Sequence, residues 1–315
     1  MIQKSGLFLK RYKSLAILLI LLILVAVLNP GFFRSANIRN VLLKVSIQGI
    51  IGFGMTFALI AGEFDMSVGS ILTLSGIIFA SLLESMGFFP ALLITLCCGA
   101  VMGLINGTLI SRLKLSSFIA TLGTQYVYKA IALIISQGKP IRISDPVAMA
   151  IGSFRIGKST IFPLLFLVAG VITAYVLNKT RLGRNIYATG GNTEVASNSG
   201  INTKLYKTIA FVIVCTASAL AGVLMSIRLQ SATTIAGDDT SLTVVSSVII
   251  GGTSPAGGVG GAFESFIGLL IIAVVTANLD LMGISGYYQQ VVQGALTVLI
   301  IGATSYATYR KTKSV

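Results

Sequence analysis

Long apolar runs, separated by short polar segments, follow one another along almost the whole chain. A membrane-spanning helix needs roughly 20 mainly apolar residues. Runs that meet or approach this length fall at about 14–33, 41–61, 71–89, 91–111, 115–135, 161–177, 208–227, 242–256, 262–281 and 287–306. The pattern predicts an all-α integral membrane protein of about ten transmembrane helices, with a single transmembrane domain over residues 1–315.

The apolar run at 242–256 is short and leads into a glycine-rich segment, residues 251–261. A run of this kind predicts a broken or re-entrant helix rather than a full crossing. So many glycines do not form a stable straight helix, and Pro255 favours a tight, specific turn over a flexible loop. The turn glycines that we single out are Gly251, Gly252, Gly257 and Gly258.

Glycines also recur at every fourth position of the run at 91–111, at Gly99, Gly103 and Gly107. Residues four apart lie on the same face of a helix. Small residues on one face allow two membrane helices to approach closely. The spacing therefore predicts a close helix–helix contact along this span.

The composition excludes a soluble domain, since 55% of the residues are hydrophobic, only 10% are charged and the mean hydropathy is +0.93. If the N-terminus is inside, most Lys and Arg residues fall in cytoplasmic segments, so both termini are expected in the cytoplasm. The net charge of +14 then reflects orientation in a lipid bilayer. Nucleic-acid binding is not indicated, because the basic residues form no face interleaved with aromatic residues.

Residues 178–207 form the longest polar interruption that is also strongly basic. Its five basic residues stand against one acid, Glu194: Lys179, Arg181, Arg184, Lys204 and Lys207. The charge predicts a cytoplasmic loop, whereas the segment at 136–160 is expected on the extracytoplasmic side. A cytoplasmic loop of this size on an otherwise buried protein indicates a docking site for a partner.

The chain contains no histidine, and its nine acidic residues are scattered. These facts argue against His-based general-base catalysis, Ser-His hydrolysis and His-rich metal sites. Cys97, Cys98 and Cys215 fall inside predicted spans, where apolar packing is a better interpretation than a disulfide or a metal site. We therefore expect no enzyme activity, no catalytic residue and no bound metal.

Residues 152–159, GSFRIGKS, match the phosphate-binding P-loop pattern. That pattern binds phosphate only where a buried strand enters the loop and a helix leaves it. Here the flanks are a polar segment and a membrane span, and the predicted topology places the match outside the cell. We interpret it as a polar loop.

Residues 61–70 place two acids and two serines between long apolar runs: Glu63, Asp65, Ser67 and Ser70. Acids inside a membrane are costly unless they are paired or face water, so they usually line a pathway. The neighbouring glycines suggest a broken helix whose freed backbone groups face a cavity. The alternative is a solvated cytoplasmic turn with Ser67 or Ser70 as the helix N-cap, and the residues alone do not decide between the two.

Five ordered motifs carry a resemblance: FDMSVGS at 64–70, SFIATL at 117–122, TRLGR followed by YA and GGN over 180–192, SGI at 199–201, and GGTSPAGG at 251–258. Together they resemble the motifs of the ribose-permease family, the membrane permeases of bacterial ABC importers for simple sugars. The resemblance covers nearly the whole chain. It implies a multi-pass protein of the bacterial plasma (inner) membrane with about ten helices.

The resemblance also implies partners. They are a pair of cytoplasmic ABC ATPase subunits, an extracytoplasmic sugar-binding protein and a second permease copy, which is either identical or a paralogue. ATP is bound by the ATPase, so no cofactor is expected in this chain.

A short coupling helix near Thr193–Ser199 is expected to dock on the ATPase, capped by Asn192 or Thr193, with Glu194 suited to its first turn. The residues expected to take part in coupling are Gly190, Gly191, Asn192, Glu194, Ala196 and Ser199.

The chain departs from the family at 241–243, where an acid is common, and at Glu63 and Glu264. Wider relatives carry nucleosides or branched-chain amino acids, so these substrates are alternatives to a simple sugar. A different class of function is an ion-coupled secondary transporter, in which Glu63 and Asp65 carry protons or sodium. If Asp65 instead accepts hydrogen bonds from the backbone amides of Ser67 and Val68, its role is structural.

Overall fold

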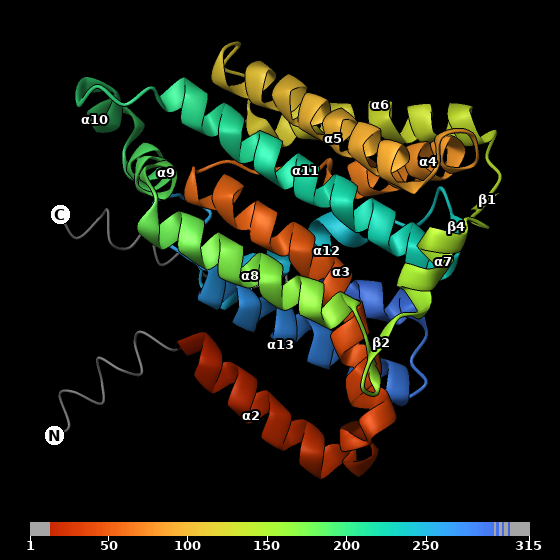
Figure 1. The fold of residues 1–315 in the computed structure, drawn as a ribbon. Helices are drawn as coiled ribbons and strands as arrows, with labels where there is room; N and C mark the ends of the chain where they lie inside the picture. The colour runs from red at the N-terminus through yellow and green to blue at the C-terminus, as the bar shows by residue number, and fades with distance from the viewer. Residues whose placement is uncertain (1–12, 293, 296–297, 299–301, 303–315) are drawn as a thin grey trace, which may run out of the picture.

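The protein is a bundle of helices in a computed structural model, which describes residues 13–292, 294–295, 298 and 302 (Figure 1). In chain order the elements are α2 (Lys13–Leu28), η1 (Pro30–Phe33), α3 (Ser35–Ile60), α4 (Val68–Met86), α5 (Phe88–Ser111), α6 (Ser117–Ser136), β1 (Ile141–Arg142), α7 (Pro146–Ser153), β2 (Arg155–Ile156), β3 (Ser159–Thr160), α8 (Phe162–Lys179), α9 (Arg181–Gly191), α10 (Thr193–Asn198), α11 (Thr203–Leu229), β4 (Ser231–Ala232), α12 (Thr240–Gly251) and α13 (Ala262–Leu281). The predicted all-α membrane architecture is confirmed.

Seven of the described helices are long and apolar enough to cross a membrane, namely α3, α4, α5, α6, α8, α11 and α13. The predicted spans at 14–33 and 242–256 correspond to two shorter apolar helices, α2 and α12. The tenth predicted span, at 287–306, lies largely outside the described residues. As expected, α12 is only 12 residues long and stops at Gly252, whose φ of 118° suits glycine.

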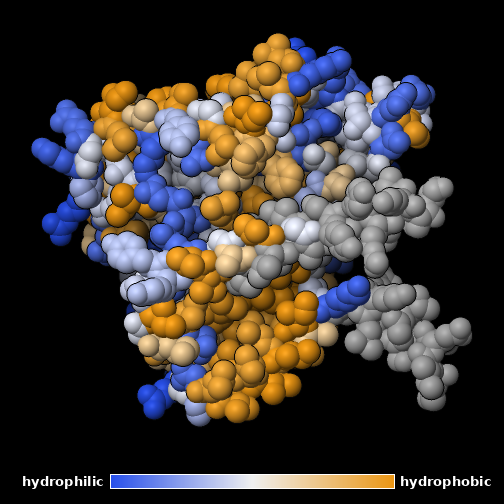
Figure 2. Space-filling view, turned by 180° about the vertical axis from the view of Figure 1, so that it is seen from behind, coloured by the Kyte–Doolittle hydropathy of each residue, from blue (hydrophilic) through white to orange (hydrophobic). Residues whose placement is uncertain are grey.

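The centre of the bundle is formed by α3 and α11. α11 packs against α5, α3 and α4, while α3 is also covered by α8, α12 and α13. Aromatic rings close one of these contacts, since Phe53 of α3 stacks on Phe166 of α8 with centroids 5.1 Å apart. In α5, α6 and α8 most residues of the apolar spans are only partly buried or exposed. A broad apolar surface is also visible on the face shown in Figure 2. Such surfaces suit contact with lipid or with another membrane chain.

The polar segments gather at opposite ends of the bundle (Figure 1). α9 and α10 lie at one end, beside the start of α11. The other end carries α7 and two small antiparallel pairs, β1 with β4 and β2 with β3. The segments at 137–161 and 180–202 are therefore separated by the length of the long helices α8 and α11.

The P-loop match at 152–159 covers the end of α7 and the β2–β3 hairpin. Gly157, at φ 62°, provides the turn of the hairpin. A phosphate-binding P-loop requires a strand that leads through the loop into a helix, and the order here is helix, strand, turn and strand. The segment is more regular than the loop we expected, but it lacks the geometry of a nucleotide site.

The predicted close contact of the span at 91–111 is confirmed, and its partner is α11. A Cβ added at Gly99 would lie 2.5 Å from the Ala219 Cβ. At Gly103 it would lie 2.6 Å from the Val212 Cα, and at Gly107 it would lie 2.8 Å from the Thr208 Cα. The backbones of α5 and α11 thus approach too closely for any side chain at these three positions.

We predict that Gly103→Ala destabilises the protein by about 1–3 kcal/mol, because the new methyl group would overlap backbone atoms of α11. Gly123→Ala in α6 is the matched control, since nothing lies within 4 Å of a Cβ added there. That change should be neutral or slightly stabilising, because alanine favours helix by about 0.5–1 kcal/mol over glycine. Thermal unfolding of the detergent-purified variants measures both effects, and equal melting temperatures would contradict the packing argument.

Candidate functional site

The chain is unwound between α3 and α4, and the buried side chain of Asp65 organises this break. Its Oδ1 accepts hydrogen bonds from the Ser67 amide at 2.8 Å and from the Ser67 hydroxyl at 2.6 Å. Both residues are fully buried, so the alternative of a solvated turn is wrong for them. Ser67 occupies the N-cap position of α4 without a side-chain cap bond, and Ser70 is buried in the first turn.

The second oxygen of Asp65 joins the break to two distant helices. Its Oδ2 accepts a hydrogen bond from the Cys215 thiol of α11 at 3.2 Å and a longer one from the Asn106 amide of α5 at 3.4 Å. Asn106 also donates to the Ser67 hydroxyl at 2.8 Å, and Tyr128 of α6 donates to Asn106 Oδ1 at 3.3 Å. Cys215 is packed in the apolar core, as expected, and its thiol in addition donates to a buried carboxylate.

Backbone groups freed by the break find side-chain partners on α6. The Phe64 amide donates to Ser117 Oγ at 3.2 Å, and the Met66 amide donates to Thr121 Oγ1 at 3.0 Å. Ser117 and Thr121 stand one helical turn apart, which explains the hydroxyls of the SFIATL motif physically. The sequence contains the motif, but its spacing does not indicate which backbone amides the Ser117 and Thr121 hydroxyls would accept hydrogen bonds from.

A second set of contacts seals the break against the start of α12. The Ser241 hydroxyl donates to the Met66 carbonyl at 2.7 Å and accepts from the Gly69 amide at 3.1 Å. A Cβ added at Gly69 would lie 2.2 Å from the Gly237 carbonyl oxygen, so only glycine fits there. The Ser241 hydroxyl therefore serves both a backbone donor and a backbone acceptor of the break.

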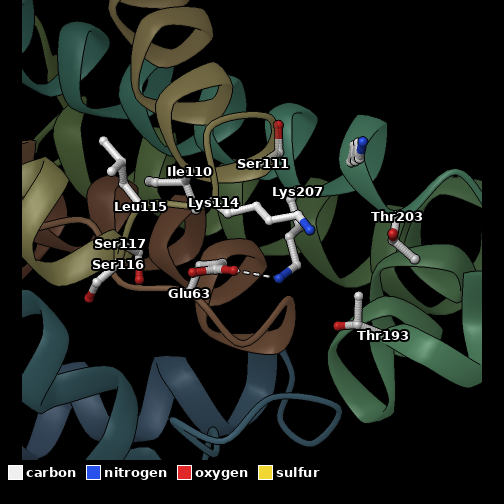
Figure 3. Close-up of a pocket in the computed structure, with 11 residues that line it drawn as sticks. Glu63, Ile110, Ser111, Lys114, Leu115, Ser116, Ser117, Thr193, Thr203 and Lys207 are labelled. Atoms are coloured by element: carbon white, nitrogen blue, oxygen red, sulfur yellow. Dashed lines mark hydrogen bonds and ion pairs between the residues drawn. The ribbon is translucent and has the colours of Figure 1, made fainter.

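Glu63, at the other side of the break, forms an ion pair with Lys207 in the second turn of α11, with the Lys207 Nζ and Glu63 Oε1 atoms 2.6 Å apart (Figure 3). Both side chains are mostly buried. The pair lies in a crevice of about 580 Å³, into which Lys114 also extends. The remaining lining residues come from α5, the α5–α6 loop, α6, α10 and α11: Ile110, Ser111, Leu115, Ser116, Ser117, Thr193, Thr203 and Lys204.

A short helix is present where one was predicted, as α10, Thr193–Asn198; its coupling role stays a prediction. Asn192 is its cap, since its Oδ1 accepts from the amides of Glu194 and Val195, each at 3.0 Å. Ala196 is its one buried residue, whereas Glu194 and the terminal Ser199 are exposed. The preceding residues, predicted only as part of a loop, form a second helix, α9.

Three glycine segments meet behind α10 and join it to the break. The Gly258 amide donates to the Ile60 carbonyl, the last residue of α3, at 2.8 Å. A Cβ added at Gly190 would lie 1.7 Å from the same carbonyl, and one at Gly257 would lie 2.5 Å from the Gly190 carbonyl. The turn at 251–261 is thus tight and specific, as predicted. Nothing lies within 4 Å of a Cβ added at Gly191, whereas Gly252 is constrained by its φ of 118° rather than by a close neighbour.

Tyr187 of α9 fastens the same junction, because its hydroxyl donates to the Gly260 carbonyl at 2.6 Å. Burial, and secondarily the Glu264 carboxylate, raises the pKa of Tyr187, so the hydroxyl keeps its proton and remains a donor. Neither Tyr187 nor Lys207 was singled out as a site residue from the sequence. Their roles depend on contacts with residues 73 and 144 positions away.

Comparison of the amino-acid sequence with known proteins places the chain in a family. Residues 37–301 match the family described as "Branched-chain amino acid transport system / permease component". The chain is 39% identical to the ribose import permease protein RbsC of Bacillus subtilis, over 90% of this chain and 89% of the relative. It is 35% identical to the ribose import permease protein RbsC of Haemophilus influenzae, over 97% and 96%. It is also 35% identical to the D-allose transport system permease protein AlsC of Escherichia coli, over 94% and 92%. No solved structure matches the chain.

We predict that Asp65→Ala lowers stability far more than Asp65→Asn. Alanine leaves several buried donors without an acceptor, at about 1–3 kcal/mol each. Asparagine keeps one carbonyl oxygen for Ser67. Cys215→Ser, which retains a donor, should be milder than either change at Asp65.

Asp145→Ala is the matched control, since the Asp145 carboxylate only caps α7 through the Ala148 amide; the cost there should be about 0.5–2 kcal/mol. Thermal unfolding and yield in the membrane measure the whole series. Equal losses in Asp65→Asn and Asp65→Ala would contradict the hydrogen-bonding role.

Proposed function

Because the chain belongs to the family of transport-system permease components, we propose that it is the transmembrane subunit of an ATP-driven, binding-protein-dependent importer in the bacterial plasma membrane. The proposed solute is a simple sugar, such as a ribose-like pentose or a hexose. The observation that carries the proposal is the similarity, over nine-tenths of the chain or more, to import permeases for ribose and allose.

In this proposal α10 receives the motion of the ATPase. It is exposed at one end of the bundle, and Asn192 holds its first turn rigidly. The junction of Gly190, Ile60 and Gly258 lies directly behind it. At this junction backbone lies directly against backbone, with no side chain between them that could absorb a movement. A displacement of α10 would therefore be transmitted to the end of α3. It would next reach the unwound segment, residues 61–67.

The unwound segment is the proposed moving barrier. It is held from one side by α6 and from the other by Ser241 of α12. Polar hydrogen bonds of this kind have alternative partners, so they can exchange when helices shift, whereas the glycine contacts of α5 with α11 cannot. The crevice beside Glu63 and Lys207 would be the exit on the cytoplasmic side of this barrier.

The other expected partners are assigned to the remaining surfaces of the bundle. The end that carries α7 and the hairpins is the proposed contact with the extracytoplasmic sugar-binding protein. The exposed apolar faces of α6 and α8 suit lipid and a second permease copy. ATP is bound and hydrolysed by the ATPase, and this subunit performs no covalent chemistry.

Ion coupling through Glu63 or Asp65 is less favoured. Glu63 already pairs with Lys207, and Asp65 accepts hydrogen bonds from four donor groups. A carrier carboxylate must exchange its proton or ion with water during every cycle. Carboxylates whose oxygens already have these partners are poorly suited to that exchange.

We predict that proteoliposomes containing this chain, its ATPase and its binding protein take up radiolabelled ribose or another monosaccharide only with ATP. Ionophores that collapse proton and sodium gradients should leave the rate unchanged. Nucleosides and branched-chain amino acids, offered in parallel with their own controls, test the alternative substrates. Uptake driven by an ion gradient without ATP would overturn the proposal.

We predict that Glu194→Lys inserts normally but weakens ATPase association and abolishes uptake. A positive charge would then face the positive end of the α10 dipole, and the charge offered to the ATPase would be reversed. Glu84→Lys is the matched control, because Glu84 is an exposed acid near the opposite end of the bundle. Co-purification of the ATPase with each variant provides the measurement, and full association of Glu194→Lys would remove α10 from the coupling mechanism.

A further inference from the structure

A second cavity, of about 280 Å³, opens between α3, α4, α11, α12 and α13. Its α11 residues are Met225, Arg228 and Leu229, at the end of that helix far from the Glu63 crevice. Lys207 and Met225 are 18 residues apart, which corresponds to about 27 Å along an α-helix. The two hollows therefore lie toward opposite ends of the bundle.

The contact that seals the unwound segment separates the two hollows. Leu72, Ala236 and Thr240 line this cavity. Next to them in the chain, the Gly237 amide donates to Thr73 Oγ1 at 3.1 Å and the Gly69 amide donates to Ser241 Oγ. Beyond that seal lies the buried Asp65. The cavity thus ends at the barrier that an importer must open.

The polar lining of the cavity is rich in hydrogen-bond donors. It comprises Lys44, Gln48, Arg228, Thr240, Thr243 and Thr276. Among the described residues that line it there is no acidic or aromatic side chain. The volume lies just below the range of small-molecule sites, which are about 300–1,000 Å³. Such a lining offers hydrogen bonds to hydroxyl groups without the strong binding that would hold a solute back.

Arg228 gives the cavity its uncompensated charge. Lys44 is paired with Asp280 of α13, whereas no carboxylate of the described residues forms an ion pair with Arg228. All nine acids of the chain lie within the described residues, so no further acidic side chain is available from the rest. Asp239 lies next to Thr240, but its carboxylate accepts hydrogen bonds from Gln290 and does not line the cavity.

We propose that this cavity is the extracytoplasmic part of the solute path, and that Arg228 determines its charge preference by admitting neutral or acidic monosaccharides and opposing cationic solutes. The guanidinium group stays charged and presents up to five donors in a planar fork, which matches adjacent hydroxyls or a carboxylate. An unpaired cation within a low-dielectric wall repels other cations over several ångströms. The inference rests on the proposed function, because it names the path of the transported solute.

The test uses charged thiol reagents at Met225→Cys, with the native cysteines replaced and Cys215 changed to Ser. Met225 is three residues from Arg228 and lines the same cavity. In right-side-out vesicles carrying the complete importer, the anionic sulfonatoethyl and cationic trimethylammonioethyl methanethiosulfonates are compared. Each rate is divided by that reagent's rate with free cysteine. We expect the anionic reagent to react about three- to tenfold faster than the cationic one.

Arg228→Gln should abolish this preference, and Arg228→Lys should retain it. Arg142→Gln is the matched control, since Arg142 is an exposed cation at the same end of the bundle and does not line the cavity. If Arg228→Gln fails to insert into the membrane, the salt dependence of the two labelling rates is measured instead in Met225→Cys with Arg228 unchanged. The preference should shrink as ionic strength rises, because the Debye length falls from about 30 Å at 0.01 M to about 10 Å at 0.1 M.

Modification of Met225→Cys should also block ATP-driven sugar uptake. Absence of reaction with either reagent, equal normalised rates, or a preference that survives Arg228→Gln would overturn the inference. Normal sugar uptake alongside any of these results would leave the proposed function standing. Charge-selective labelling without uptake of any sugar would instead overturn the proposed function.

Discussion

The carboxylate of Asp65 accepts hydrogen bonds from a backbone amide, a hydroxyl, a side-chain amide and a thiol, which belong to the α3–α4 break, α5 and α11. An acid buried among membrane helices is costly unless such partners surround it. Because these donors come from elements far apart in the chain, the break forms only when α5 and α11 are already in place. Residues 61–67 can then remain unwound inside the bundle without losing the hydrogen bonds of their backbone.

Glycine contacts complement this polar network. In water-soluble proteins helices are held together by burial of apolar surface, but lipid offers no such drive, so close backbone approach and interhelical hydrogen bonds take its place. The pairing of α5 with α11 and the junction of Gly190 with Ile60 both rely on the absence of a side chain. In the proposed mechanism, the glycine contacts on either side of the hydrogen-bonded break would concentrate motion at the break.

Charge is distributed in a way that fits this arrangement. Glu63 and Lys207 neutralise each other where the crevice reaches the break, and Lys129 is paired with Asp238 at the opposite side of the barrier. Arg228 has no such acidic partner among the described residues, so it gives the second cavity a positive charge. Lys114 and Lys204 also line the crevice, so both hollows carry a net positive charge, and in the second cavity that charge comes from Arg228.

The sequence by itself determined the membrane class, the approximate limits of the nine described apolar helices, the tight glycine turn and the position of α10, with its cap at Asn192 or Thr193. Each depends on residues close together in the chain, through hydropathy, helix propensity or local capping, and these act before tertiary contacts exist. The α5 glycine spacing likewise predicted a close contact without naming α11. Only the tertiary structure decided between a solvated turn and a buried break at Asp65, paired Glu63 with Lys207, and gave Cys215 a polar role. Those outcomes depend on which distant helices become neighbours, and the free energy of burying a charge is set by those neighbours rather than by the residue itself.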